Sequence, residues 1–279
     1  MQPPFLNVIF VVYYLYVFIR GVLKMSRIIV IANQKGGVGK TTTAINLSAS
    51  LAARKKRTLL VDMDPQGNAS SGFDIKSNEN SSNIYDVMLG EAAIEDAVIQ
   101  NVRPRLSVIP SDVDLAACEI QLSDKENRNE ILRDEISRIR DNYEFVIIDC
   151  PPSLNILTLN AMCAADTVLV PLQCEYYALE GLAQLMQTVK LVSERLNQNL
   201  HIEGIVFTMY DSRTNLANQV VENVEQNTDK KIYKAIVPRN VRLAEAPSYG
   251  MPITEYDPKS SGAKAYDLLA KKVIRYKGR

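Results

Sequence analysis

The chain has 279 residues, enough for one large α/β domain or two small ones, with the hydrophobic (47%) and charged (23%) content of an ordinary globular protein. Its 32 basic and 32 acidic residues cancel, which excludes affinity for nucleic acid through bulk charge and leaves only local patches. The four cysteines (118, 150, 163 and 174) form no Cys-x-x-Cys pair, which argues against a disulfide framework or a zinc site. We therefore expect reduced, mostly buried thiols in a cytoplasmic protein, and a surface position for the only histidine, His201.

Residues 1–24 differ from the rest of the chain. Phe5 to Ile19 is almost wholly apolar and aromatic, and Arg20 and Lys24 follow it. A run of about 15 residues is shorter than the ~20 needed to span a bilayer as a helix, and a signal peptide would carry its positive charges first. The favoured interpretation is that residues 1–24 come from an upstream start-codon assignment, with one folded domain over 25–279; a hydrophobic anchor is the alternative.

The first predicted elements enclose a glycine-rich loop. Residues 28–32 are predicted to form a buried strand and residues 44–52 a helix, with Asn-Gln-Lys-Gly-Gly-Val-Gly-Lys-Thr-Thr at 33–42 between them. A strand, a glycine loop and a helix in this order predict a phosphate-binding site. The glycines allow the backbone N–H groups to approach an anion, and the helix N-terminus adds a positive dipole end. Nucleotide contacts are expected from Gly36, Gly37, Val38, Gly39, Lys40, Thr41 and Thr42.

Two lysines distinguish this loop. Lys40 is placed to reach the β- and γ-phosphates, and the Thr41 hydroxyl to bind Mg²⁺. The general phosphate-loop pattern has glycine where this chain has Gln34, and a second lysine, Lys35, stands at the loop entrance. The loop is therefore a variant of the common motif.

Carboxylates follow two further predicted strands. Residues 58–61 precede Asp62 and Asp64, and residues 145–149 end in Asp149, which has the Walker B form. Because the carboxyl ends of parallel strands meet at one sheet edge, these side chains are expected beside the loop, serving Mg²⁺ and the attacking water.

The remaining pattern alternates between strands and helices. Residues 70–83 are predicted as a loop, and Tyr176 and Tyr177 as core residues. Strands are expected at 106–110, 168–171, 202–209 and 232–236, and helices at 84–89, 92–99, 128–140, 178–196, 215–226 and 261–276. Repeated β-α units without a long linker predict one α/β domain, a mostly parallel twisted sheet with helices on both faces.

These motifs together resemble those of the ParA family of partition ATPases, of the Soj type and the deviant Walker A class of P-loop NTPases. The resemblance rests on the loop at 33–43, Asp-Met-Asp-Pro-Gln-Gly-Asn at 62–68 and Ile-Ile-Asp-Cys-Pro-Pro-Ser at 147–153. It extends to Gln-Cys-Glu-Tyr-Tyr-Ala-Leu-Glu-Gly at 173–181, Arg-Thr-Asn-Leu at 213–216 and Pro-Arg-Asn-Val-Arg-Leu-Ala-Glu-Ala-Pro-Ser at 238–248. Residues 1–24 are the main departure.

The resemblance implies an ATP-dependent dimer with two ATP molecules between the subunits. Lys35 matches the lysine that reaches the partner's nucleotide, and Lys40 the phosphate lysine. Asp64 matches the residue that orients water for hydrolysis, and Thr41, Asp62 and Asp149 match groups near Mg²⁺. Pro238, Arg239 and Asn240 match residues that help to hold the adenine. Catalysis in such a site is mostly positioning and charge neutralisation.

The resemblance also implies nonspecific DNA binding by the ATP dimer and stimulation of hydrolysis by a ParB-like centromere-binding partner, in a nucleoid-associated protein. Arg213 and Arg242 lie at matching basic positions. From Arg239 to Arg279 nine basic and four acidic residues give a net charge of +5, which suits phosphate contacts without sequence readout. The alternatives are solvated surface arginines and, for the last helix, lysines that favour its C-terminal dipole.

Two other classes share this loop. A membrane-positioned regulator resembling MinD would use a C-terminal amphipathic helix, and the predicted last helix has apolar residues on one side. An electron-transfer protein resembling nitrogenase iron protein would bind a cluster through thiolates such as Cys118, Cys150 and Cys163, but the Soj-like motifs are absent from that branch.

Overall fold

The computed structural model describes residues 26–76 and 82–276. The prediction for residues 1–24 therefore lies outside the described residues. Among the helices formed by the described residues, none combines the length and apolar character needed to cross a membrane.

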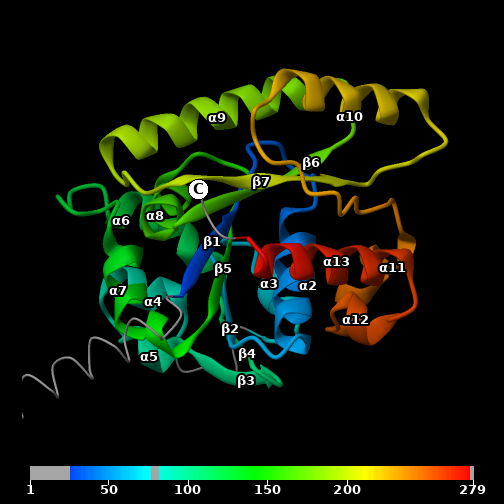
Figure 1. Ribbon diagram of the computed structural model, residues 1–279. Coiled ribbons are helices and arrows are strands. Elements are labelled where there is room, and N and C mark those ends of the chain that lie inside the picture. Colours follow the sequence, from blue (N-terminus) through cyan, green and yellow to red (C-terminus); the bar gives the residue numbers. More distant parts are fainter. Residues whose placement is uncertain (1–25, 77–81, 277–279) are drawn as a thin grey trace, which may run out of the picture.

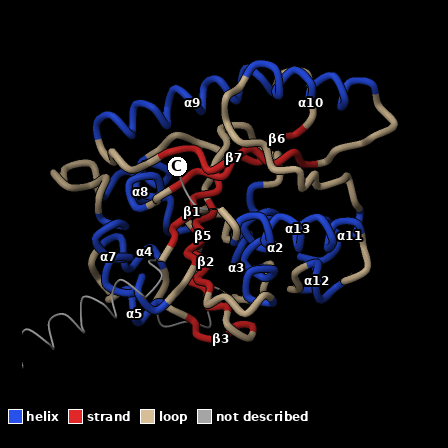
Figure 2. The backbone as a smooth tube through the Cα atoms, in the orientation of Figure 1, coloured by secondary structure: helices blue, strands red, loops and turns tan. Residues whose placement is uncertain are grey.

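A seven-stranded sheet forms the centre of the molecule (Figure 2). Its order is β3-β4-β2-β5-β1-β6-β7, and every neighbouring pair is parallel except β3 and β4. The strands are β1 (Arg27–Ile31), β2 (Thr58–Asp62), β3 (Ile99–Arg103), β4 (Leu106–Ile109), β5 (Phe145–Asp149), β6 (Thr167–Gln173) and β7 (His201–Thr208). The predicted mostly parallel sheet is confirmed.

Helices cover both faces of the sheet, as predicted (Figure 1). One face carries α2 (Lys40–Ala53), α3 (Asn68–Ser71), α11 (Val241–Glu245), α12 (Ile253–Tyr256) and α13 (Ser261–Ile274). The other carries α4 (Ile84–Leu89), α5 (Ile94–Ala97), α6 (Cys118–Gln121), α7 (Ile131–Ile139), α8 (Ile156–Ala164), α9 (Ala178–Arg195) and α10 (Asn215–Asn227). Successive strand residues alternate between the two cores: Ile28 packs in one and Ile29 in the other. Burial on both faces explains the continuous apolar strand sequences.

The predicted strand at 232–236 is wrong. In the described part of the chain, residues 232–238 run along the outer edge of β7 and form only isolated bridges, Ile205 with Ile232 and Tyr210 with Pro238. The Tyr233 N–H donates to the Ile205 carbonyl and the Val237 N–H to the Phe207 carbonyl, each at 2.8 Å. Between these two bonds the outer segment advances from residue 233 to 237, whereas β7 advances only from 205 to 207. The outer segment therefore has two extra residues, and a continuous ladder cannot form.

Other differences lie near turns. The helix predicted at 92–99 is the short α5, and the chain then enters β3, which pairs antiparallel with β4. The helix α8 was not predicted, although Asn155 caps it by accepting from the Thr158 N–H at 3.2 Å. The prediction that Tyr176 and Tyr177 are core residues is wrong, because they are 78% and 65% exposed.

Candidate nucleotide-binding site

The glycine-rich loop joins the carboxyl end of β1 to α2. Gly37 and Gly39 have φ of +74° and +85°, in the left-handed region that strains other residues. Gly39 is also the N-cap of α2, so the loop leads directly to the positive end of that helix. The buried Thr208 hydroxyl at the end of β7 donates to the Val38 carbonyl at 2.8 Å. The loop is thus held in shape by the sheet.

Two carboxylates stand side by side next to this loop. Asp62 and Asp149 are register partners on β2 and β5, and both are 0% exposed. Asp62 accepts hydrogen bonds from the Ser70 N–H at 2.8 Å and the Ser70 hydroxyl at 2.7 Å. Neither oxygen of Asp149 has a hydrogen bond of acceptable geometry in the described part of the chain, although the Thr41 side chain lies close enough to influence it. Asp149 is therefore a buried carboxylate with open coordination sites.

Burial shifts the pKa values of Asp62, Asp149 and Lys40 toward their uncharged forms. Burial raises the pKa of Asp62 to about 6, with a smaller contribution from the Asp64 carboxylate. Burial, followed by the neighbouring Asp62, raises the pKa of Asp149 well above its usual range. Burial also lowers the pKa of Lys40, an effect opposed by Asp149. A divalent cation would favour the ionised carboxylates, and hard oxygen donors such as Asp149 and Thr41 fit Mg²⁺.

A cavity of about 450 Å³ opens beside the loop. It is lined by Gly39 and Thr42 of the loop and helix, by Met209 after β7, and by the predicted adenine residues. The predicted adenine residues in this lining are Pro238, Arg239 and Asn240. The cavity has the size of a small-molecule site. The structure thus brings together residues about 200 positions apart that were predicted to hold one nucleotide.

Lys35 and Asp64 follow β1 and β2 at the same carboxyl edge of the sheet. The Lys35 carbonyl accepts a hydrogen bond from the Lys40 ammonium at 3.1 Å, and the Lys35 ammonium contacts Glu175 of the same chain. Asp64 is 7% exposed and accepts from the Gln66 N–H at 3.0 Å. All the predicted phosphate, metal and catalytic residues therefore gather at one sheet edge.

Comparisons with known proteins agree with this geometry. A protein-family profile described as an AAA domain matches residues 26–202. The chromosome partitioning protein ParA of Myxococcus xanthus is 52% identical over 256 residues, covering 92% of this chain and 90% of that protein. The chromosome-partitioning ATPase Soj of Treponema pallidum is 48% identical over 254 residues, covering 91% and 99%. The chain belongs to the ParA/Soj family of chromosome-partitioning ATPases.

A solved structure supports the nucleotide assignment. Cobyrinic acid a,c-diamide synthase from Mycobacterium smegmatis, with bound ADP and magnesium, is 33% identical with a TM-score of 0.80, covering 91% of this chain and 97% of that one. The chain described in Figure 1 is accordingly an ATPase, and it has the same fold as that nucleotide-bound structure.

The predicted DNA-contacting arginines lie on neighbouring segments. Arg213 follows Tyr210 and Arg242 follows Pro238, and a β-bridge joins the backbones of Tyr210 and Pro238. The Arg213 side chain is 85% exposed and paired with Asp211, with Nε at 2.8 Å from the carboxylate. Arg242 is 52% exposed and lies 2.9 Å from Glu245. Both guanidinium groups are at the surface, and both already have an acidic neighbour.

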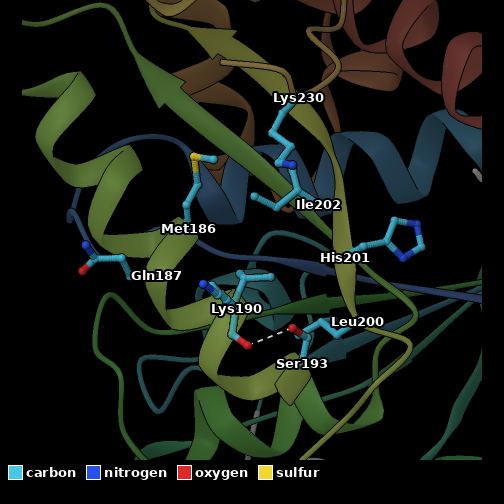
Figure 3. Close-up of a pocket in the computed structure, with 9 residues that line it drawn as sticks. Met186, Gln187, Lys190, Ser193, Leu200, His201, Ile202 and Lys230 are labelled. Carbon is cyan, nitrogen blue, oxygen red and sulfur yellow. Dashed lines mark hydrogen bonds between the residues drawn. The ribbon is translucent and has the colours of Figure 1, made fainter. Parts of the chain in front are cut away.

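A second cavity, of about 370 Å³, lies between α9 and the amino end of β7 (Figure 3). Figure 3 shows Met186 and Ile202 pointing toward Lys230, while His201 points to the other side of its strand. None of the predicted site residues is among those that line this cavity. It is therefore separate from the nucleotide site, which lies at the carboxyl ends of the strands.

The cysteines do not favour a metal cluster. Cys118, Cys150 and Cys163 are buried, and burial raises the pKa of the Cys118 and Cys163 thiols to about 11. Thiolates, the form that binds iron–sulfur clusters, are disfavoured there.

Four side chains that support the site were not predicted: Ser70, Glu175, Thr208 and Met209. Glu175 lay inside a motif that was noted without a role, and Thr208 and Met209 end a predicted strand. Because the carboxyl end of a parallel strand is where ligands bind, that position was the available signal.

Proposed function

We propose that this chain is a DNA-partitioning ATPase whose ATP-bound state forms a sandwich dimer and binds DNA without sequence preference. The observation that carries the proposal is the juxtaposition of three features at one sheet edge: the glycine loop, the cavity of about 450 Å³, and the buried Asp149, which has no well-formed hydrogen bond within residues 26–76 and 82–276. Such a site can hold a nucleotide with its metal and leave one side open to a second subunit.

The chemistry follows from the positions of the side chains. The loop N–H groups from Gly36 to Gly39 and the Lys40 ammonium would hold the phosphates. Thr41, Asp62 and Asp149 would hold Mg²⁺, which when bound neutralises phosphate charge. Asp64, two residues beyond Asp62, would orient the attacking water, and Pro238, Arg239 and Asn240 would hold the base.

The dimer proposal is supported by what is exposed around the loop. Lys35 is 38% exposed at the loop entrance, and Tyr176 and Tyr177 form an exposed edge-to-face pair with ring centroids 5.1 Å apart. Exposed aromatic side chains are frequent at protein–protein contacts. A second copy that covers them would place its own nucleotide near Lys35, which would act like an arginine finger.

DNA binding is supported by the basic C-terminal segment. Its four acidic residues, Glu245, Glu255, Asp257 and Asp267, each contact an arginine, and two of those arginines come from outside the segment. Among the described residues of the segment, the exposed Lys259, Lys264 and Lys271 would add phosphate contacts. Release would follow hydrolysis, stimulated by a ParB-like partner.

The MinD-like membrane alternative has less support. The apolar residues Leu269 and Val273 of α13 are 0% exposed, because this helix packs against α2, and Leu268 is 39% exposed. A helix whose apolar side is already buried has little apolar surface left for a membrane.

The test is DNA binding with ADP, ATP and a nonhydrolysable ATP analogue over a salt series. We expect binding only with ATP or the analogue, an affinity that falls steeply with salt, and equal affinity for unrelated sequences. Arg213→Ala and Arg242→Ala should weaken binding to all sequences alike and reduce the salt slope, whereas Arg138→Ala, on α7, serves as control. Binding that is equal with ADP and ATP contradicts the proposal.

Liposome sedimentation separates the two functions. Pelleting with anionic vesicles that requires ATP, together with no DNA binding, would favour the membrane regulator. The chain beginning at Met25 should be assayed beside the full chain, so that the apolar run at 5–19 does not determine the result.

A further inference from the structure

The entrance of the phosphate loop is tied to its own chain by three consecutive side chains. The Asn33 amide donates to a backbone carbonyl of β6 at 2.7 Å, and the Gln34 amide donates to the Thr188 hydroxyl of α9 at 3.2 Å. The Lys35 ammonium contacts the Glu175 carboxylate. The entrance of the loop is therefore attached to β6, to α9 and to the turn between them.

Both backbones that carry the Lys35–Glu175 contact are fixed. Glu175 lies in the turn 174–177, where its N–H donates to the Gln173 carbonyl at 2.9 Å and its carbonyl accepts from the Ala178 N–H at 3.0 Å. The Lys35 N–H donates to the Asn33 side chain at 3.0 Å. The Lys35 ammonium can therefore leave Glu175 by rotating its side chain, without disturbing these bonds.

We propose that Glu175 is a positioning residue for Lys35: it holds the ammonium on its own subunit and competes for it with the nucleotide of a second subunit. This inference rests on the proposed function, in which Lys35 reaches across the dimer. An ammonium is a compact point charge, so its contact with Glu175 offsets part of the positive charge that Lys35 can offer to a phosphate of the other subunit. Glu175 therefore raises the nucleotide concentration at which dimers form.

The size of this effect is limited by solvent. The two side chains are 38% and 44% exposed, and exposed ion pairs of this kind shift an equilibrium by about fivefold at most. A nucleotide carries several negative charges, so it outcompetes one carboxylate. The contact sets a threshold for dimerisation and does not prevent it.

The first test measures the contact in the nucleotide-free full chain. Amine labelling near neutral pH, followed by mass spectrometry of the Lys35 peptide, reports how well the ammonium is covered. We expect Glu175→Gln to increase the labelling rate of Lys35 by about two- to fivefold and Glu175→Ala to do so at least as much. Glu180→Gln, an exposed charge change in the first turn of α9, should leave it unchanged. Unchanged labelling in both Glu175 variants would overturn the inference.

The second test measures dimerisation by sedimentation as a nonhydrolysable ATP analogue is titrated. We expect Glu175→Gln to form dimers at up to about fivefold lower analogue concentration, with Glu180→Gln equal to wild type, and the difference should shrink at high salt. Weaker dimerisation of Glu175→Gln would overturn the inference, since Glu175 would then support the dimer. A wild-type chain that stays monomeric refutes the proposed dimer, while the labelling result still decides whether Glu175 holds Lys35.

Discussion

Replacing Asp149 by asparagine should stabilise the nucleotide-free protein and remove most of its stabilisation by Mg²⁺ and ATP. The Asp149 carboxylate is 0% exposed, lies beside Asp62 in register, and lacks a well-formed hydrogen bond to any residue that the structure describes. Its removal relieves a buried charge that Lys40 offsets only in part and that a bound cation would compensate further. The two effects have opposite signs, which makes the prediction specific.

The magnitude can be worked from the pair of carboxylates. Burial and the neighbouring Asp62 both raise the pKa of Asp149, and a buried charge without full compensation costs about 3 kcal/mol or more. A buried asparagine amide without partners costs about 1–2 kcal/mol. The net gain is then on the order of 1–2 kcal/mol, or a few degrees in unfolding temperature for a chain of this size.

The assay is thermal unfolding at pH 7.5 without ligand, with ATP and EDTA, and with ATP and Mg²⁺, with the exposed Asp141→Asn as control. Wild type should gain about 2.7 kcal/mol at a ligand concentration 100-fold above Kd, and Asp149→Asn should lose the Mg²⁺-dependent part. Because the pKa of Asp149 is higher in the folded than in the unfolded protein, the ionised carboxylate lowers the free energy of unfolding at pH values above the folded-state pKa. This loss of stability disappears as the pH falls from the folded-state pKa to the unfolded-state pKa. The advantage of Asp149→Asn should therefore shrink on acidification. A variant that is less stable than wild type without ligand, or that responds equally to Mg²⁺, would refute the reasoning.

Three further predictions concern single side chains. Lys40→Ala should abolish ATP binding in a calorimetric titration, because the phosphate-loop ammonium is lost; normal affinity would contradict its role. Asp64→Ala should keep ATP and DNA binding but block hydrolysis, measured as phosphate release; near-normal turnover would reassign the water-positioning role, with Asp62 the next candidate. Gly204→Ala should lower the free energy of unfolding by about 1–3 kcal/mol in urea, because the new Cβ would lie 2.7 Å from the Tyr233 ring and 2.9 Å from the Lys231 carbonyl oxygen; an unchanged midpoint would contradict this.

The phosphate loop, the carboxylates at the strand ends and the fold class were all predictable from the sequence. Each depends on a local pattern: continuous apolar runs for strands buried on both faces, glycines for a loop with positive φ, and aspartates directly after two strands. The C-terminal adenine motif was assigned by resemblance, and the structure places it in the same cavity as the loop.

The tertiary structure alone decided which distant side chains meet. Lys35 and Glu175 are 140 positions apart, and no local pattern links them. Tyr176 and Tyr177 looked like core residues because aromatics bury large areas, but their turn projects from the carboxyl edge of the sheet. The segment at 232–236 has the alternation of a strand, yet its offset against β7 prevents a ladder. Local propensity sets how each segment can fold, whereas the order of strands in the sheet sets which segments become neighbours.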